Sequence, residues 1–320
     1  MTYASLSLDL DNEWSYLKTH GDPAWESFPS YLDIVVPRAL ELLHRLGLRI
    51  TFFIVGQDAA LERNAKALRS IADAGHEIGN HSFNHEPWLQ HYDREGVRRE
   101  LVSAGDAITA ATGMRPRGFR GPGFSLSRST LELLAELDYT YDATTFPTYI
   151  GPLARAYYFM TAKLSSEELE KRRALFGSVR DGLRPLRAYR WKLDHTSLTE
   201  IPVTTFPGMK IPIHFSYILY LATLAPPLAL PYFRTALTAC RLSGLQPSLL
   251  LHPLDFMGCD DVASLAFFPA MNRRADQKLP ILESSLRALR DTFGEVIPVG
   301  EHAERAARSP KLKERIPDFS

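Results

Sequence analysis

The residues best suited to chemistry in this 320-residue chain are two histidines four positions apart, His81 and His85. On one helical turn, or on a helix-like loop at the end of a strand, that spacing puts both imidazoles on one side. Two neutral imidazoles in this arrangement can bind one divalent transition metal. A pair of surface histidines would show the same spacing, so the metal interpretation depends on further ligands elsewhere in the chain.

Two carboxylates near the N-terminus are the first candidates for such ligands. Residues 3–10 alternate in hydrophobicity and predict a strand, which contains Asp9 and is followed at once by Asp11. In an extended chain, residues i and i+2 point to the same side. Sheets of α/β proteins hold their chemistry at the carboxyl ends of the strands. A solvated acidic turn or a helix cap is the alternative interpretation of this pair.

An arginine and a third histidine complete the set of candidate residues. Arg120 opens a turn with two glycines and a proline, and glycine allows backbone N–H groups to approach a ligand closely. Arg120 could pair with a carboxylate such as Asp9 and orient it. His252 ends a strand expected at 248–251, at the mouth of a sheet. An ordinary turn with a surface arginine, and a core histidine with satisfied hydrogen bonds, are the alternatives.

The elements that must position these side chains alternate between strand and helix. We expect strands at 3–10, 49–55, 76–79, 117–119, 138–142, 200–205, 248–251 and 296–297, and helices at 31–46, 61–74, 94–112, 127–137, 231–242, 272–293 and 300–308. Such alternation predicts a parallel sheet wrapped by helices. We expect one catalytic domain over residues 1–308, with a frayed tail at 309–320.

Two segments interrupt this alternation. At about 144–198, prolines and aromatic residues surround a charged helix expected near 165–175, and we interpret the segment as an insertion that shapes the substrate side. Residues 211–233 carry no charge apart from the titratable His214. An uncharged segment of this length could cross a bilayer. Prolines interrupt this segment. One interpretation is a buried helix pair. A second is an apolar ledge for a lipid-linked substrate, or a segment that dips into the membrane interface. A third is a spanning helix.

The composition excludes some functions and suggests a compartment. The chain has 37 Lys and Arg against 37 Asp and Glu, so its net charge is zero and no broad basic surface for nucleic acid is expected. Cys240 and Cys259 form no disulfide framework and no CxxC metal motif, which fits a reducing compartment. Strand-like sequence begins at about Tyr3 without a basic region and apolar run, so we expect no signal peptide and a cytoplasmic protein.

Four motifs follow one another along the chain. They are the strand-end carboxylates, the His-x-x-x-His pair, the Arg-x-Pro turn and the Leu-x-Leu-His strand. Over about residues 6–255 the chain thereby resembles the NodB-like polysaccharide deacetylases of carbohydrate esterase family 4. The resemblance implies a distorted (β/α) barrel with an inserted segment. It also implies a metal-dependent hydrolase that removes an acetyl or formyl group from the nitrogen of an amino sugar.

The resemblance also implies roles for the first two motifs. Where the family usually has two adjacent aspartates, this chain has one residue between Asp9 and Asp11. Asp9 would be the general base and Asp11 a metal ligand, with Glu13 as a further carboxylate able to take either role. His81 and His85 would be the other metal ligands. Zinc is the default metal for such ligands, with cobalt or nickel as alternatives.

The remaining roles implied by the resemblance concern the base, the oxyanion and the acid. Arg120 would orient the base, and a backbone N–H near Gly123 would help to bind the oxyanion. His252 would be the general acid that protonates the leaving amine. Asp142, which follows Tyr139 and Tyr141, would support that acid.

A finer resemblance concerns residues 37–43, 50–53 and 252–258. They resemble the branch that includes the deformylase acting on formamido-arabinose carried by undecaprenyl phosphate. A lipid-linked sugar would suit the uncharged segment 211–233 and a peripheral position at the inner membrane face. Two other functions remain open at this stage: a ring amide or imide hydrolase of the same fold, and a non-catalytic binding protein on that fold. The sequence does not predict an oligomeric state.

Overall fold

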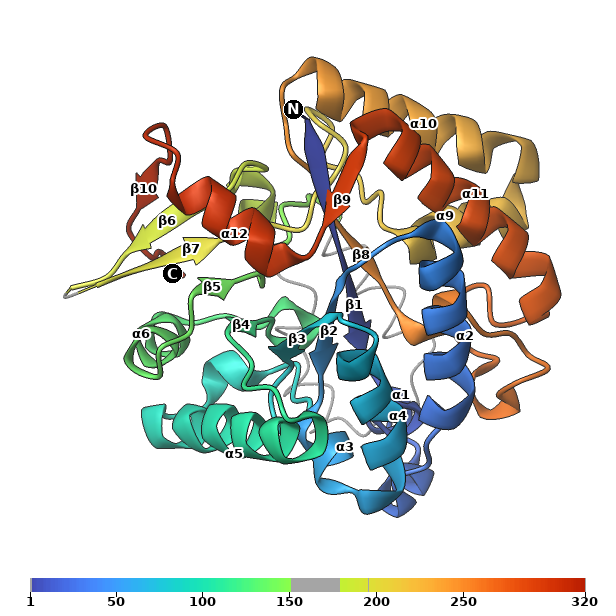
Figure 1. Ribbon diagram of the computed structural model, residues 1–320, viewed down its shortest axis with the longest axis horizontal. Coiled ribbons are helices and arrows are strands. Elements are labelled where there is room, and N and C mark those ends of the chain that lie inside the picture. Colours follow the sequence, from blue (N-terminus) through green and yellow to red (C-terminus); the bar gives the residue numbers. More distant parts are fainter. Residues whose placement is uncertain (1, 151–178, 195, 320) are drawn as a thin grey trace.

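The computed structural model describes residues 2–150, 179–194 and 196–319. Strand β1 (Tyr3–Leu10) runs through the middle of the molecule, with helices on both sides (Figure 1). It pairs in parallel with β2 (Thr51–Ile54) on one side and with β8 (Ser248–Leu251) on the other. The short β9 (Glu295–Ile297) pairs with the first three residues of β1. Because β1 is covered on both faces, nearly all of its residues are buried.

The sheet has the parallel order expected from the alternation of strands and helices. From β8 it continues through β1 and β2 to β3 (Glu77–Asn80), β4 (Gly118–Phe119), β5 (Tyr141–Asp142) and β7 (Ser197–Glu200). The strand expected at 200–205 ends at Glu200. The chain beyond it connects the loop after β5 with β8, because Val203 N donates to Thr145 O (2.9 Å) and Thr204 N donates to Ser248 O (2.8 Å). The sheet is thereby curled into a distorted barrel.

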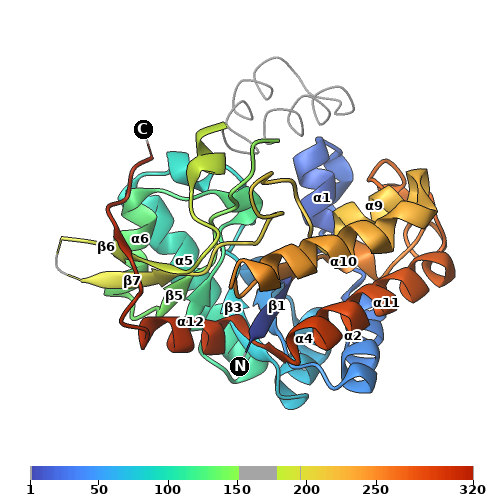
Figure 2. The ribbon, with the colours of Figure 1, turned by 90° about the horizontal axis from the view of Figure 1, so that it is seen from above.

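The helices lie around this barrel (Figures 1 and 2). Helix α2 ends at Gly47 in a left-handed conformation, and α5 begins at Asp93, whose side chain accepts a hydrogen bond from Gly96 N. The described helices are α1 (Glu13–His20), α2 (Leu32–Leu46), α3 (Gly56–Ala60), α4 (Glu62–Asp73), α5 (Arg94–Thr112), α6 (Arg128–Glu136), α9 (Phe215–Leu224), α10 (Pro226–Leu242), α11 (Ala275–Phe293) and α12 (Val299–Ala307).

The uncharged segment 211–233 forms a packed helix pair. Helix α9 ends at Leu224, and Pro226 opens α10, where the missing N–H of proline costs nothing. Phe215 and Phe233 pack against each other in the core, with ring centroids 5.4 Å apart. Within the part of the chain described by the structure, no helix is long and apolar enough to cross a membrane. The segment is therefore a helix pair whose Phe215 and Phe233 lie in the core, while Leu224 and Leu228 at its junction are exposed.

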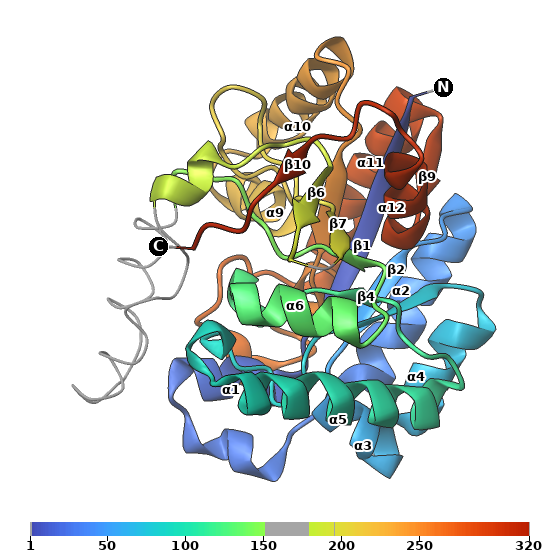
Figure 3. The ribbon, with the colours of Figure 1, turned by 90° about the vertical axis from the view of Figure 1, so that its left-hand side faces the viewer.

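Two expectations for the irregular regions have different outcomes. The charged helix expected near 165–175 lies outside the described residues. The frayed tail was a wrong expectation, because β10 (Glu314–Arg315) pairs in parallel with β6 (Tyr189–Lys192), itself antiparallel to β7. Figure 3 shows the C-terminal segment running along β6. The tail provides backbone partners to an otherwise open edge strand and packs Phe319 on Trp191.

One buried histidine links α12 to the start of β1. His302 Nδ1 lies 2.8 Å from Ser5 Oγ, and the ring packs edge-on against Tyr3. Burial and the nearby charge of Arg305 lower the pKa of His302 to about 3. The folded protein therefore keeps this imidazole neutral at a pH where an exposed histidine would be charged.

We predict that His302 contributes to acid destabilisation. The unfolded chain binds a proton at this histidine near pH 6.5, whereas the folded chain binds it only near pH 3. Between these values the unfolded state binds more protons, so the free energy of unfolding falls as the pH drops, by up to about 1.4 kcal/mol per pH unit. Urea unfolding at several pH values between 7 and 4 should show a shallower fall in His302→Gln. Equal slopes in the two proteins would contradict the prediction.

Candidate active site

Three potential metal ligands converge at the carboxyl end of the sheet. Asp11 Oδ1 lies 3.2 Å from His81 Nε2 and 3.0 Å from His85 Nε2, and the three side chains are buried. One ligand atom from each lies within 4.8 Å of the others. Asp11 follows β1 and the histidines follow β3. Since only β2 separates these strands, their ends lie close together. The hydroxyl of Tyr31 donates to the backbone oxygen of Asp11 (2.6 Å), which holds that residue in place.

The hydrogen bonds of this cluster fit a metal site. His81 Nδ1 lies 2.6 Å from the backbone oxygen of Arg120, and a proton on Nδ1 leaves the Nε2 lone pair directed at Asp11. Burial raises the pKa of Asp11, but His85 and His81 outweigh it and hold this pKa well below its usual range. A buried carboxylate and two imidazoles that share one focus are the donor set that zinc and related divalent metals prefer.

The loop that carries the two histidines is not helical. Ser82 and His85 have positive φ values of 61° and 51°, and the loop is held by backbone hydrogen bonds to the start of α3. Gly56 N donates to Ser82 O (2.8 Å), and Gln57 N donates to the next carbonyl along the loop (3.0 Å). These contacts, rather than a helical turn, place both imidazoles on the same side.

Glu100 on α5 also holds the histidine loop in place. This residue was not identified from the sequence. Its carboxylate accepts hydrogen bonds from Phe83 N (2.9 Å) and Asn84 N (2.8 Å) and from the Asn84 side chain. At the end of β3, the side-chain oxygen of Asn80 accepts from Ser82 N (2.8 Å). The sequence gives no signal for this role of Glu100, because its partner Asn84 lies 16 residues away along the chain.

Arg120 and Asp9 form a buried ion pair beside the metal ligands. Arg120 Nη1 lies 2.7 Å from Asp9 Oδ1 and 2.7 Å from Ser7 Oγ, and its Nε donates to Ala143 O (2.9 Å). The guanidinium also lies over the ring of Phe53, 4.4 Å from its centroid. The arginine is fully buried. The contact expected between the turn and the first carboxylate is therefore present, and it fixes the orientation of Asp9.

His252 stands at the same end of the sheet as Asp9, since Leu251 is the register partner of Leu8. Its Nδ1 lies 3.0 Å from the hydroxyl of Ser216 on α9, and its backbone N donates to Asp255 (2.9 Å). The imidazole is therefore held by its Nδ1 side. Ser216 and Asp255 are supporting residues that sequence reasoning did not identify.

Among the described residues, no hydrogen bond joins Asp142 to His252, the acid that it was expected to support. Asp142 is fully buried in β5, where it accepts a hydrogen bond from Thr144 Oγ1 (2.5 Å). Burial and the adjacent Glu200 raise the pKa of Asp142 well above its usual range. Asp142 therefore stabilises the strand end that carries the carbonyl partner of Arg120. Among the described residues, the hydroxyl of Ser216 is the group at His252 Nδ1.

Glu13 and Gly123 differ in how they relate to the site. Glu13 accepts a hydrogen bond from Ser264 (2.6 Å) and is not one of the three converging ligands. Gly123 has a φ of 58°, and a Cβ there would lie 2.8 Å from Pro87 Cβ, so the turn after Arg120 requires glycine. The oxyanion role of this turn stays a prediction.

Two further polar side chains border the site. The hydroxyl of Tyr16 is buried and has no hydrogen-bond partner among the described residues. Burial and the charges of Asp11, Asp255 and Asp9 raise its pKa well above the usual value. His214 is also buried, 5.7 Å from the His252 ring, and burial keeps its pKa well below the usual value. Both can offer a hydrogen bond to a substrate.

We predict that the protein binds about one zinc ion per chain through the Asp11 cluster. The double variant His81→Ala/His85→Ala should lose this zinc, because it removes two of three ligands. The exposed pair His44 and His91 supplies the matched control, and His44→Ala/His91→Ala should keep the metal. Metal content is measured by mass spectrometry after incubation with zinc and gel filtration. Absence of metal from the unaltered protein after zinc, cobalt or nickel would contradict the prediction.

We predict that Arg120→Met destabilises the fold by about 3–5 kcal/mol, because it leaves Asp9 buried without its partner. The double variant Arg120→Met/Asp9→Asn should recover part of this loss, since the unpaired charge is gone. Arg128→Met removes an exposed pair with Glu132 and should cost less than about 1 kcal/mol. Urea unfolding of the four proteins measures these differences. An Arg120→Met cost no larger than that of Arg128→Met would refute the role of the ion pair.

Comparison with known families agrees with this arrangement. Residues 25–141 match the family model described as polysaccharide deacetylase, a stretch that includes His81, His85 and Arg120. A peptidoglycan deacetylase from Helicobacter pylori is 30% identical over 110 residues, which cover 34% of this chain and 36% of that protein. The chain spans about a third of the length of the curated relatives it matches.

Two solved structures share the fold described above. A proposed polysaccharide deacetylase from Mycobacterium smegmatis superposes with a TM-score of 0.65 at 22% identity, over 99% of this chain and 94% of that one. The PuuE allantoinase structure superposes with a TM-score of 0.56 at 16% identity, over 96% and 91% of the two chains. Over residues 25–141 the chain is therefore similar to the polysaccharide deacetylases, and over its length it shares their fold.

Proposed function

We propose that this protein is a metal-dependent hydrolase that removes an N-acyl group from an amino sugar. The observation that carries the proposal is the convergence of Asp11, His81 and His85 beside the buried Asp9–Arg120 pair. A metal-ligand triad next to an oriented carboxylate can activate water for the hydrolysis of an amide.

The side chains divide the work of such a reaction. A divalent metal held by Asp11, His81 and His85 would lower the pKa of a water molecule and polarise the amide carbonyl. Asp9, oriented by Arg120, accepts the proton of the attacking water. The backbone N–H groups of the turn at Gly123 stabilise the negative charge that develops on the carbonyl oxygen.

Departure of the amine requires a proton from the opposite side. His252 supplies it to the leaving nitrogen, with Ser216 at Nδ1 of its ring and Asp255 at its backbone N. The products are a free amino sugar and a small carboxylic acid.

The acyl group in this proposal is acetyl or formyl, and the metal is zinc, with cobalt or nickel as alternatives. The formyl case corresponds to the deformylase branch and to a lipid-linked amino sugar. Leu224 and Leu228, at the junction of α9 and α10, are 68% and 60% exposed and would suit peripheral contact with a membrane. We place this activity in the cytoplasm, at the inner membrane face. The two cysteines are free, as a reducing compartment would keep them.

We predict that His252→Ala lowers the rate of acid release by about 10²–10⁴-fold while the zinc content stays unchanged, because the residue moves a proton and binds no metal. Acetate released from N-acetylglucosamine oligomers, and formate released from N-formylated amino sugars, are measured with coupled dehydrogenases. His44→Ala serves as the control and should keep full turnover. Equal loss of zinc in His252→Ala would overturn the acid assignment. Ring opening of allantoin without acid release from sugars would instead favour the ring amide hydrolase.

A further inference from the structure

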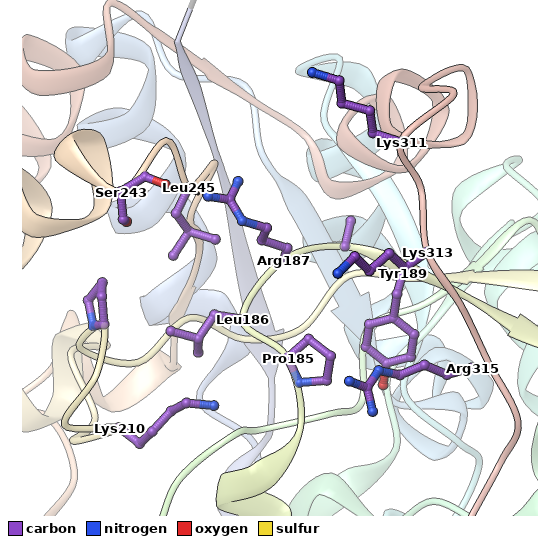
Figure 4. Close-up of a pocket in the computed structure, with 12 residues that line it drawn as sticks. Pro185, Leu186, Arg187, Tyr189, Lys210, Ser243, Leu245, Lys311, Lys313 and Arg315 are labelled. Atoms are coloured by element: carbon purple, nitrogen blue, oxygen red, sulfur yellow. Dashed lines mark hydrogen bonds between the residues drawn. The ribbon is translucent and has the colours of Figure 1, made fainter.

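A pocket of about 410 Å³ lies at the edge of the sheet near β6 and the C-terminal segment. Figure 4 shows that its walls come from the chain before β6, the loop after β7, the end of α10 and the segment around β10. None of the residues assigned to the candidate active site lines it. Among the described residues that line it, none is acidic and five are cations: Arg187, Lys210, Lys311, Lys313 and Arg315.

Backbone carbonyls, not carboxylates, hold two of these cations. Arg187 Nη1 donates to Gly244 O (2.5 Å), and its Nη2 donates to Ser243 O, both just beyond α10. Lys210 Nζ donates to Arg184 O (2.6 Å). Carbonyl partners fix the position of a side chain but leave its full charge uncompensated. Arg187 and Lys210 are therefore prepositioned positive charges.

The other cations come from the C-terminal segment. The guanidinium of Arg315 lies over the ring of Tyr189, 5.9 Å from its centroid. Lys311 and Lys313 are exposed. Burial and the repulsion of Arg315 lower the pKa of Lys210, as expected where positive charges gather. Across residues 2–150, 179–194 and 196–319, none of the five pocket cations has a carboxylate within ion-pair distance.

This arrangement contrasts with the rest of the surface. The chain has equal numbers of basic and acidic residues, and its other exposed arginines commonly pair with carboxylates. Arg305 contacts Glu295 (2.6 Å), and Arg128 contacts Glu132 (2.8 Å). Five cations gathered in one hollow without acids indicate that a multivalent anion supplies the missing charge.

We propose that this pocket binds a phosphate group, either a phosphate ester or a pyrophosphate. Two guanidinium groups and three ammonium groups offer many N–H donors around one hollow, which suits the several oxygens of phosphate better than a single carboxylate. Pro185 and Leu245 in the wall provide apolar contact for the organic part of an ester. The inference rests on the pocket alone and does not depend on the proposed hydrolysis.

The test uses inorganic pyrophosphate titrated into the full-length protein by calorimetry at constant ionic strength. Lys313→Glu should weaken binding at least about tenfold, because it removes one charge and adds a repulsive one. Its side chain is exposed, so folding should be unaffected, which a urea melt checks. Lys313→Gln/Arg315→Gln should weaken binding to a similar extent. Lys66→Gln, on the exposed side of α4, is the control and should bind as the unaltered protein does.

Vesicles distinguish a soluble phosphate from a lipid headgroup. Sedimentation with phosphatidylcholine vesicles, with and without phosphatidic acid, is compared with pyrophosphate binding. Saturable pyrophosphate binding that Lys313→Glu weakens supports a soluble ligand. Binding only to phosphatidic acid vesicles, weakened by the same variant, supports a headgroup. Equal binding of sulfate and pyrophosphate, no binding of any probe, or equal loss in Lys66→Gln would overturn the proposal.

Discussion

The buried ion pair between Arg120 and Asp9 is the interaction on which the candidate site depends. A buried guanidinium is costly unless its donors have partners, and here Nη1 and Nε are hydrogen-bonded to groups from two neighbouring parts of the sheet. Ser7 and Asp9 belong to β1, and Ala143 follows β5. Arg120 also offers its own backbone oxygen to His81. Arg120 therefore sets the position of the candidate base through its side chain and constrains a metal ligand through its backbone.

The metal cluster depends on the same strand ends but is held by a different set of contacts. The histidine loop has two residues with positive φ, which cost energy unless neighbours determine the conformation. The start of α3 and the carboxylate of Glu100 supply those contacts. The two imidazoles are therefore prepositioned by secondary elements on both sides of the loop, which is the condition for a preorganised site.

Charge is distributed differently at the two sites. In the candidate active site, Asp9 is paired with Arg120, and Asp11 lies against the two imidazoles that would share a metal with it. In the pocket near β6, positive charges are fixed by carbonyls and an aromatic ring, and no wall residue that the structure describes carries a carboxylate. The first arrangement is suited to proton transfer, and the second to the binding of an anion.

The sequence by itself determined the strands and helices that bring the site together. The pattern of β1, the glycines after α2 and α5, and the apolar strand before His252 are local signals, since period and helix stops arise within a few residues. From them follows the alternation that places Asp9, His81 and Arg120 at one end of a parallel sheet. The motifs at 81–85 and at Arg120 were correspondingly informative.

Only the tertiary structure decided the contacts between distant segments. Asp142 was expected to support His252, but the fold places it beside Glu200, and Ser216 takes the position at His252. The pairing of β10 with β6 joins segments more than 100 residues apart, and a short polar segment carries no periodicity that reveals its partner. The contacts of Glu100 and the cationic pocket likewise depend on segments that are distant in the sequence. Their function depends on which side chains the chain brings together in space, and a local pattern holds no information on that.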